Sequence, residues 1–379
     1  MMATNDRSRG GAHFLVMAAA TIIVIGGVRF AGPLLIPFVL AAFLAILCLP
    51  AVALLTRYRV PTVLAVLVVV LVLGGVLSGV GAIVGGSINQ FTEAVPKYEQ
   101  RVDQLWASVE GWIEDLPSEF FPFDLDPGQS TSPLEVIKPG QLMGFLGTSL
   151  KGVLAALQNT FMVILTLVFM LLEATTFPTK IRLAFGGGKG DLDRFAVVTG
   201  QVQRYLAIKT VTSLVTGLLV GGWVGIMGLD FAVVWGLVAF MLNYIPNIGS
   251  IVAAVPAVLL AVVQLGVGPG IAVAVGYLVI NISMGNLIEP ALLGRSLGLS
   301  TLVVFLSLIF WGWMWGTVGM LLSVPLTMII KIFLESSDDL RWAAILLDSG
   351  RALEARLSQE DEGATVAEVS HSRSPDGDA

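Results

Sequence analysis

The sequence is poor in charge. Only 13% of its 379 residues are charged, whereas 56% are hydrophobic, and a soluble domain carries about a quarter charged residues. This number of charges is too small to cover the surface of a soluble protein of this size. Most of the surface is therefore expected to face lipid. The composition therefore excludes an ordinary soluble domain and predicts an all-α integral membrane protein that has the lipid bilayer as a partner.

The residues that most active sites and metal sites need are also scarce. Cys48 is the only cysteine, which excludes a disulfide framework and any CxxC metal or redox site. The two histidines, His13 and His371, stand near opposite ends of the chain, and the sequence has neither an HExxH nor a GxSxG motif. We therefore predict no enzyme activity, no catalytic residue, no metal site, no cofactor and no nucleic-acid partner.

A phosphate-binding loop is missing as well. The glycine-rich segment 185–191 reads FGGGKGD, but no glycine stands five residues before Gly188, and Gly190 occupies the position of the Mg²⁺-binding Ser or Thr. We interpret this segment as a turn. ATP-driven transport by this chain alone is therefore disfavoured.

Long uncharged runs are abundant. They occupy 12–28, 30–56, 62–88, 152–172, 210–229, 231–288 and 296–330. A helix needs about 20 apolar residues to cross a membrane, so several runs fit one crossing, whereas the last two are too long for one. Residues 1–88 are predicted to form an N-terminal cytoplasmic tip and the first three transmembrane helices.

Residues 89–150 have a different character, with ten acidic and three basic residues. Apolar residues recur at alternating spacings of four and three along a single helical seam. The seam consists of Phe91, Val95, Tyr98, Val102, Leu105, Val109 and Trp112. We predict a helical arm outside the membrane. Its seam either covers the second helix of the arm or contacts a neighbouring subunit.

Basic residues predict the orientation, because they favour the cytoplasmic side. The segment 173–209 carries six bases against three acids. Placing the N-terminus in the cytoplasm puts this amphipathic segment inside and the acidic arm outside. The tail, 334–379, is then a cytoplasmic helix followed by a disordered acidic stretch.

The transmembrane core, 151–333, contains two stretches that must fold back. If Arg295 and Lys331 are both cytoplasmic, then 231–265 and 300–331 each return to the side on which they start. Each has a turn that is followed by a small residue, a valine and a proline. The proline is Pro256 in the first stretch and Pro325 in the second. We predict two broken-helix hairpins that enter from opposite faces, a common design of transporters.

The turn of the first hairpin reads NYIPNIG. A proline inside a helix removes a hydrogen-bond donor, and glycine permits close packing. The turn is either a packing feature or part of a solute path. The substrate-path candidates are Asn243, Tyr244, Pro246, Asn247 and Gly249 in the turn, with Asn281 and Asn286 on the helix that follows.

Glu289 ends a long uncharged helix, directly before Pro290 and three residues after Asn286, on the same helical face. Acidic residues inside membranes usually mark ion or substrate paths. However, Glu289 is expected near the cytoplasmic boundary, where Arg295 is a suitable partner. Glu289 and Arg295 are therefore candidates for coupling or gating.

These motifs resemble those of the autoinducer-2 exporter family, also called the PerM-type permease family. The resemblance covers about 13–333 and is carried by YIPNIG (244–249), Pro256, NLIEPALLG (286–294), WGTVGMLLSVPL (315–326) and Lys331. It implies about eight hydrophobic segments, a multi-pass protein of the bacterial inner membrane, and a homo-oligomer such as a pentamer. It also implies export of small solutes such as the quorum-sensing signal autoinducer-2. Some members are similar to Na⁺(Li⁺)/H⁺ antiporters.

Three functions follow as alternatives. The first is ATP-independent export of a small solute, an autoinducer-2-like signal or related metabolite. The second is Na⁺(Li⁺)/H⁺ antiport, with Na⁺ or H⁺ as partner. The third is a non-transporting membrane scaffold that binds partners through the 89–150 arm, and both termini are expected in the cytoplasm in each case.

Overall fold

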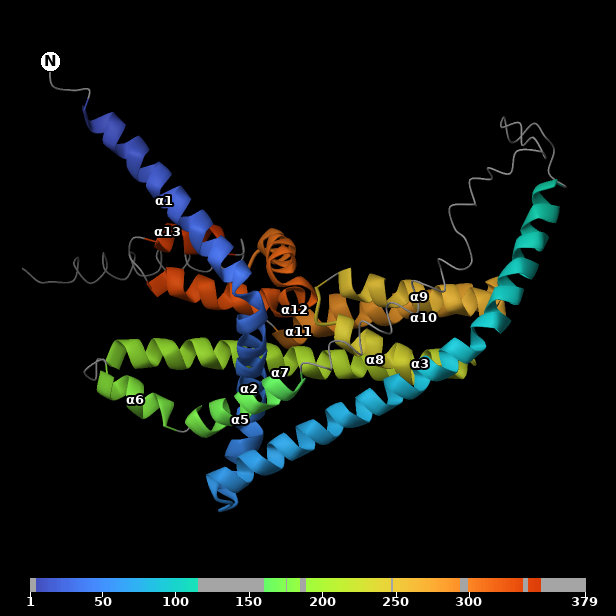
Figure 1. Cartoon of the computed structure of the whole chain (residues 1–379), viewed down its shortest axis with the longest axis horizontal. Helices are drawn as coiled ribbons and strands as arrows, with labels where there is room; N and C mark the ends of the chain where they lie inside the picture. The colour runs from blue at the N-terminus through green and yellow to red at the C-terminus, as the bar shows by residue number, and fades with distance from the viewer. Residues whose placement is uncertain are drawn as a thin grey trace, which may run out of the picture. The chain divides into compact units, whose positions relative to one another are not determined.

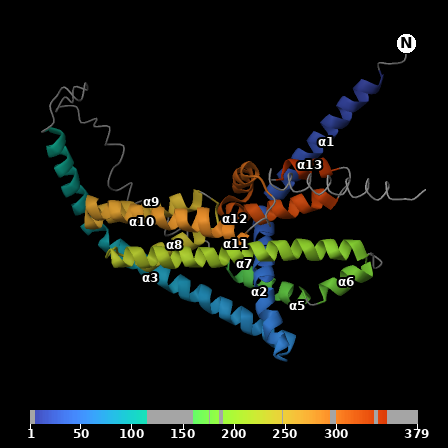
Figure 2. The ribbon, with the colours of Figure 1, turned by 180° about the vertical axis from the view of Figure 1, so that it is seen from behind.

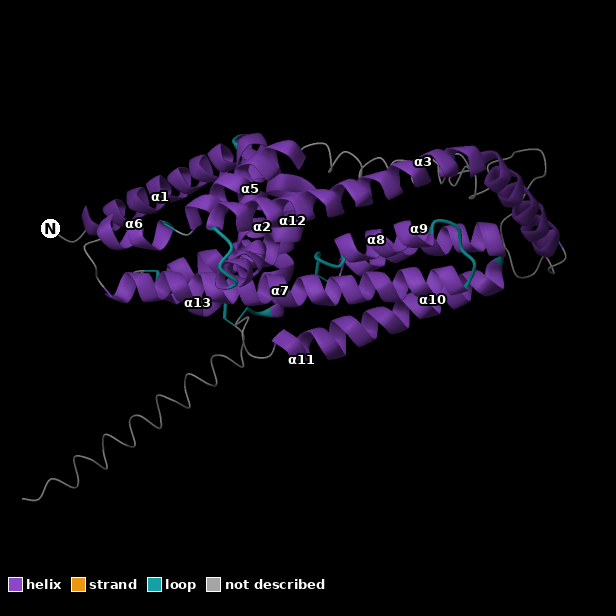
Figure 3. Ribbon diagram, turned by 90° about the horizontal axis from the view of Figure 1, so that it is seen from below, coloured by secondary structure: helices purple, strands orange, loops and turns teal. Residues whose placement is uncertain are grey.

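The computed structural model describes residues 5–114, 160–174, 176–184, 189–246, 248–293, 299–336 and 340–348. Within these ranges the chain is helical and forms no strand (Figure 3), which confirms the predicted all-α class. The helices are α1 (Asn5–Phe30), α2 (Gly32–Arg57), α3 (Thr62–Glu114), α5 (Thr160–Ala174), α6 (Phe177–Ala184), α7 (Lys189–Ile226), α8 (Ala232–Leu242), α9 (Ile248–Leu265), α10 (Val267–Ile282), the π-helical segment η2 (Ser283–Ile288), α11 (Glu289–Leu293), α12 (Thr301–Ser336) and α13 (Arg341–Leu346).

Among the described residues, six helical stretches are long and apolar enough to cross a membrane. They are Gly32–Arg57, Thr62–Ser87, Thr199–Ile226, Ile248–Leu265, Val267–Leu293 and Thr301–Glu335. Shorter apolar helices cover Leu15–Phe30, Thr160–Ala174 and Ala232–Leu242. Their outward-facing side chains are mainly aliphatic, as expected of helices that face lipid.

The chain forms two compact units. The first comprises Met1–Ile36, Thr179–Ile208 and Pro290–Ala379, and the second comprises Pro37–Pro178 and Lys209–Glu289. The second unit has two hydrophobic cores: one joins α2, α3 and α5 around Ala41, Val66 and Leu167, and the other joins α3, α7, α8, α9 and α10 around Leu260 and Tyr277. α9 and α10 run side by side (Figures 1 and 2).

Small residues let α7 approach α8 closely. A Cβ at Gly217 would lie 2.7 Å from the carbonyl oxygen of Gly236, and one at Gly221 would lie 3.3 Å from the carbonyl oxygen of Ala232. Glycines at such spacings allow backbones in membranes to come together. Gly217 and Gly221 therefore form a packing face for α8, whereas no atom lies within 4 Å of a Cβ placed at Gly222.

The arm begins as a direct continuation of the third crossing, because α3 runs without a break to Glu114. The first half of its apolar seam packs against the chain itself: Phe91 and Tyr98 are buried in the core of α7 to α10, and Val102 packs at its edge. Neither alternative drawn from the sequence included this partner. The side chains of the rest of the seam, and the second helix of the arm, lie outside the described residues.

A polar contact fixes the arm at Tyr98. Its hydroxyl donates a hydrogen bond to Asp230 Oδ2 at 2.7 Å, across 132 residues of sequence. Burial raises the pKa of the Tyr98 phenol, and the hydrogen bond to Asp230 and the repulsion from its carboxylate raise it further. The phenol therefore stays protonated and keeps donating at neutral pH.

We expect Tyr98→Phe to loosen the arm. A hydrogen bond to a charged group contributes about 1.5–3 kcal/mol, so the free energy of unfolding in detergent should fall by about that amount, and amide exchange should accelerate in residues 89–114. Tyr58→Phe is the matched control, because the Tyr58 side chain is 75% exposed. Equal exchange in the two variants would contradict the role of this contact.

The first predicted hairpin is present in the second unit. α8 and α9 pack against each other, and the described residues 243–246 after α8 form a turn. Gly249, at the start of α9, lies so close to Leu242 that a Cβ would collide with the Leu242 carbonyl oxygen. The expected close packing at Gly249 is therefore confirmed, and it lets α9 fold back on α8.

The second predicted hairpin is present in the first unit, within α12. Gly316 has a φ of 63°, a conformation that glycine adopts readily, and the helical path breaks at Trp315 and Gly316. The Trp311 indole donates to Thr327 Oγ1 at 3.1 Å. These residues would stand about 24 Å apart on a straight helix, so the two halves of α12 must fold back on each other.

The end of the described chain is attached to α12. Leu347 accepts a hydrogen bond from the Ser300 amide at 3.2 Å, and Leu299 pairs with Asp348 in an isolated β-bridge. The Asp348 carboxylate also accepts a 2.9 Å hydrogen bond from Lys331. The short helix α13 lies within the region after 334 where the sequence predicts a helix. The cytoplasmic placement of this region stays a prediction, and residues 349–379 lie outside the described part.

Candidate functional site

Four polar residues line one face of α7 in the second unit. Lys209, Thr212, Ser213 and Thr216 follow the i, i+3, i+4, i+7 spacing of a single helical face, and all four are buried. Thr212 Oγ1 donates to the Lys209 carbonyl at 3.1 Å, and Thr216 Oγ1 donates to the Thr212 carbonyl at 2.8 Å. The threonines thus satisfy their hydroxyls within the helix, which leaves Lys209 and Ser213 to contact other elements.

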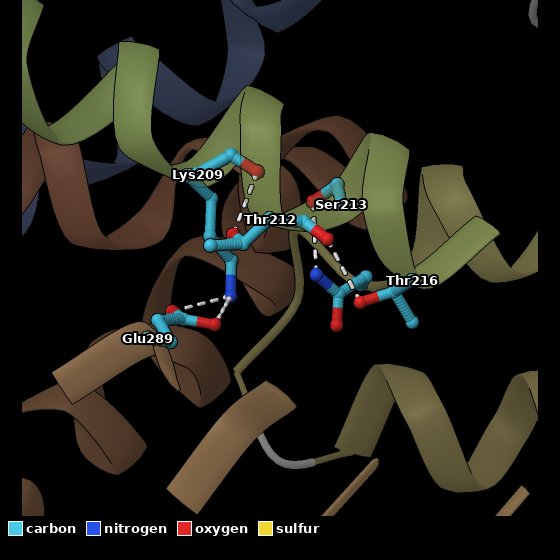
Figure 4. A network of polar contacts seen from close by, with 6 residues as sticks. Lys209, Thr212, Ser213, Thr216 and Glu289 are labelled. Carbon is cyan, nitrogen blue, oxygen red and sulfur yellow. Dashed lines mark hydrogen bonds and ion pairs between the residues drawn. The ribbon is translucent and has the colours of Figure 1, made fainter. Parts of the chain in front are cut away.

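Lys209 forms an ion pair with Glu289. Its ammonium nitrogen lies 2.6 Å from Glu289 Oε1 and 2.8 Å from Oε2, and the two side chains are 5% and 16% exposed (Figure 4). Removing two charges from water costs several kcal/mol for each ion, and the cost is recovered only when the geometry of the pair is good. The pair therefore joins the middle of α7 to the first residue of α11 by a short contact that is largely buried.

The π-helical segment η2 explains how Glu289 is placed. Pro290 lacks an amide hydrogen, and its ring clashes with the carbonyl four residues earlier in a regular helix. The chain instead widens over Ser283–Ile288, and the Glu289 amide donates to the Met284 carbonyl five residues back. Glu289 then turns toward Lys209, whereas Asn286 is exposed. The shared face expected for these two residues therefore stays a prediction.

The turn of the first hairpin reaches the same face of α7. Asn243 Nδ2 donates to Ser213 Oγ at 2.9 Å, and the Tyr244 hydroxyl donates to Thr210 Oγ1 at 2.8 Å. The α8–α9 turn, α7 and the start of α11 therefore meet through polar contacts within the second unit. We call Lys209, Thr210, Ser213, Asn243, Tyr244 and Glu289 the polar junction.

The structure brings together only some of the residues predicted as a substrate path. Asn243 and Tyr244 belong to the polar junction, and Gly249 packs behind the turn. Pro246 is half-buried in the turn, and Asn281 is half-buried on α10; neither is part of the junction. Asn247 and Arg295 lie outside the described residues, so the proposed pairing of Glu289 with Arg295 stays a prediction.

The residue that sequence reasoning missed is Lys209. Charge counting assigns it to the basic cytoplasmic segment 173–209, and its pairing with Glu289 spans 80 residues of sequence. The available signal is the polar stripe Lys209, Thr212, Ser213 and Thr216, which repeats at helical spacing at the edge of an otherwise apolar run.

The polar junction offers an ammonium group, a carboxylate, an amide and hydroxyl groups. Such groups can pair with an ion, a proton or a polar solute. Ionisable residues within membrane segments usually serve such paths. Within the described residues, no group of three or more His, Cys, Asp or Glu side chains is placed to hold a metal ion.

Comparison with known proteins supports a transport role. The sequence matches the model of the AI-2E family transporter over residues 15–338. The chain belongs to this family. It is 38% identical to the AI-2 transport protein TqsA of Escherichia coli (strain K12), over 89% of this chain and 96% of that protein. It is also 38% identical to a putative transport protein of Haemophilus influenzae (88% and 95%) and 35% identical to the putative transport protein YhhT of Escherichia coli (92% and 98%).

Membership of the AI-2E transporter family confirms the resemblance found in the sequence motifs. Together with six helices long enough to span a membrane, it makes the chain a multi-pass membrane transporter of a bacterial type. The family match covers every element of the polar junction, so the junction belongs to the shared transporter region.

Proposed function

We propose that this chain exports a small solute, an autoinducer-2-like signal or related metabolite, across the inner membrane without hydrolysing ATP. The observation that carries the proposal is the buried Lys209–Glu289 pair, held where a helical turn and a π-helical segment meet α7. The relative TqsA, named an AI-2 transport protein, supports the solute class. The sequence offers no nucleotide-binding motif.

We further propose the orientation and assembly that the sequence favours. Both termini lie in the cytoplasm, and the chain assembles as a homo-oligomer such as a pentamer. The charge bias of 173–209 supports the orientation.

Na⁺(Li⁺)/H⁺ antiport is the second candidate, and the same ion pair favours it. The Glu289 carboxylate already holds a cation, the Lys209 ammonium, with both of its oxygens. A monovalent cation or a proton that competes for this carboxylate would open the pair in the same way as a solute. The two proposed functions therefore use the same site. They differ in the transported species, which is a small solute in the first and a cation and a proton in the second.

Flux measurements in nucleotide-free proteoliposomes distinguish the candidates. We expect the chain to move autoinducer-2, and Glu289→Gln to abolish this movement because Lys209 then loses its counter-charge. Glu93→Gln is the control, since Glu93 is exposed on the arm. If autoinducer-2 does not move under any Na⁺ or pH gradient, while Glu289→Gln abolishes Na⁺-driven proton flux, the antiporter replaces the exporter.

A further inference from the structure

A cavity of about 450 Å³ lies in the second unit, where α3 leaves its membrane span and meets the start of α8. Its volume falls within the range of small-molecule sites. Of the described residues, Ser87, Gln90 and Asp230 line it with polar side chains, and its apolar walls include Phe231. An apolar pocket with a few polar groups is the usual form of a site for a small organic ligand.

Asp230 is held by its side chain and by its backbone. Tyr98 donates to Asp230 Oδ2 at 2.7 Å, the Asp230 amide donates to Gln264 Oε1 at 2.9 Å, and the Trp235 indole donates to the Asp230 carbonyl at 3.1 Å. The Tyr98 bond engages one of the two carboxylate oxygens, and the other two contacts fix the backbone that carries the carboxylate. The arrangement therefore resembles a preorganised acceptor, for which a ligand loses little entropy of ordering on binding.

The backbone beside the carboxylate is strained. Phe231 has φ 61° and ψ 33°, the left-handed region that bulky residues rarely adopt. Such a residue costs about 1–3 kcal/mol and tends to occur at ligand sites. Here the conformation directs Asp230 and Phe231 into the same cavity, and the Phe231 ring packs against Phe91 of the arm with centroids 5.9 Å apart.

The cavity stands at the far end of α7 from the polar junction. Seventeen residues of α7 separate Lys209 from the end of the helix at Ile226, which corresponds to about 26 Å along the helix axis. The hydrocarbon core of a membrane is about 30 Å thick. Two charged sites of the second unit therefore lie along α7: the Lys209–Glu289 pair within the Thr199–Ile226 crossing, and Asp230 just beyond the end of that crossing.

We propose that this cavity binds the transported solute at the end of its path opposite the polar junction, and that the solute is a small neutral molecule bearing hydroxyl groups. The proposal rests on the transport function proposed above. A solute released from the Lys209–Glu289 pair passes along α7 and occupies this cavity before it leaves the protein.

The lining favours a hydroxylated organic solute over a bare cation. A hydroxyl can donate to the Asp230 carboxylate in a charge-assisted hydrogen bond, and Gln90 and Ser87 can both donate to and accept from hydroxyls. A dehydrated metal ion needs about six closely set oxygens, which three side chains around 450 Å³ do not supply.

Cysteine labelling tests the cavity directly. Cys48 is the only cysteine, so Val233→Cys in a Cys48→Ser background places a single thiol on the cavity lining, at a side chain that is 59% exposed. With autoinducer-2 as the probe at about four times its Kd, occupancy should slow maleimide labelling by about fivefold. Asp230→Asn and Gln90→Leu should each remove this protection. Gln90 is exposed, so its variant decides if Asp230→Asn does not fold.

Two controls and a transport measurement make the outcomes distinct. Ala107→Cys places the thiol on an exposed part of the arm outside the cavity, where autoinducer-2 should not alter labelling, and Glu93→Gln should keep the protection at Val233→Cys. Unchanged labelling in protein that transports autoinducer-2 overturns the cavity proposal and leaves the exporter standing. Protection without transport retains the cavity and overturns the exporter. Protection by ethanolamine but not by autoinducer-2 overturns the assignment of a hydroxylated solute.

Discussion

Removing either partner of the Lys209–Glu289 pair should destabilise the protein and stop transport. Lys209→Met leaves the Glu289 carboxylate without a counter-charge, and Glu289→Gln leaves an ammonium group that is 5% exposed. Breaking a buried pair in this way costs about 3–5 kcal/mol, which should appear in unfolding experiments in detergent. We also expect the transport rate to fall by about tenfold or more, which corresponds to at least about 1.4 kcal/mol in the barrier.

A double variant separates the structural from the functional role of the pair. In Lys209→Met/Glu289→Leu, apolar side chains replace both charges, and such replacements are often neutral or stabilising. We expect stability to return while transport stays lost. Recovery of both would show that the pair serves folding alone. Lys97→Met, at an exposed position on the arm, is the control and should change stability by less than about 0.5 kcal/mol.

The fold was largely predictable from the sequence because its strongest signals are long apolar runs and their interruptions. The uncharged runs 30–56 and 62–88 correspond to α2 and to the first part of α3. The two hairpins followed from topology, since the cytoplasmic placement of Arg295 and Lys331 requires two stretches to turn back. Helix formation over such runs needs no long-range information, because in lipid each backbone group must be satisfied within its own segment.

The candidate site was predictable only in part. The turn residues Asn243 and Tyr244 stand out as polar groups at a break in an apolar helix, and Glu289 stands out as a charge inside the membrane. Their partners could not be assigned, because Lys209 is separated from Glu289 by 80 residues and its charge agrees equally well with a cytoplasmic flank. A polar face at helical spacing shows that α7 has a polar contact, but it does not show with which element.

The arm shows the same limit. A heptad seam indicates that one face of a helix is covered, and the spacing from Phe91 to Tyr98 indicates which face. It does not distinguish among a second helix, a neighbouring subunit and the body of the chain. The decisive contact is the one between Tyr98 and Asp230, which depends on the left-handed turn at Phe231. Nothing in the residue pattern around Phe231 predicts that conformation.

In both hairpins a glycine packs against a backbone carbonyl, although the hairpins lie in different units. In the first, a Cβ at Gly249 would collide with the Leu242 carbonyl seven residues earlier; in the second, a Cβ at Gly319 would collide with the Trp311 carbonyl eight residues earlier. Each glycine is followed by a Val-Pro step at nearly the same distance, at Pro256 and Pro325. This correspondence supports the view that the two predicted hairpins are related to each other. Their entry from opposite faces of the membrane stays a prediction.

Gly249→Ala and Gly319→Ala should therefore each disrupt a hairpin. The atom that must move is a backbone carbonyl oxygen of the facing helix end, not the tip of a flexible side chain, so the turn has to open. Overpacking of this kind costs about 1–3 kcal/mol or more. In Gly249→Ala, opening the turn also withdraws Asn243 and Tyr244 from α7, so transport should be lost even where the protein remains folded.

Gly268→Ala provides the matched control for these glycines. Gly268 lies in α10, and no atom comes within 4 Å of a Cβ at that position. Alanine should be tolerated there and should stabilise the helix by about 0.4–1 kcal/mol. The decisive measurement compares expression, thermal unfolding and transport of the three variants. If Gly249→Ala behaves like Gly268→Ala, the α8–α9 turn is not closely packed, and its contact with the Lys209 face of α7 does not depend on glycine.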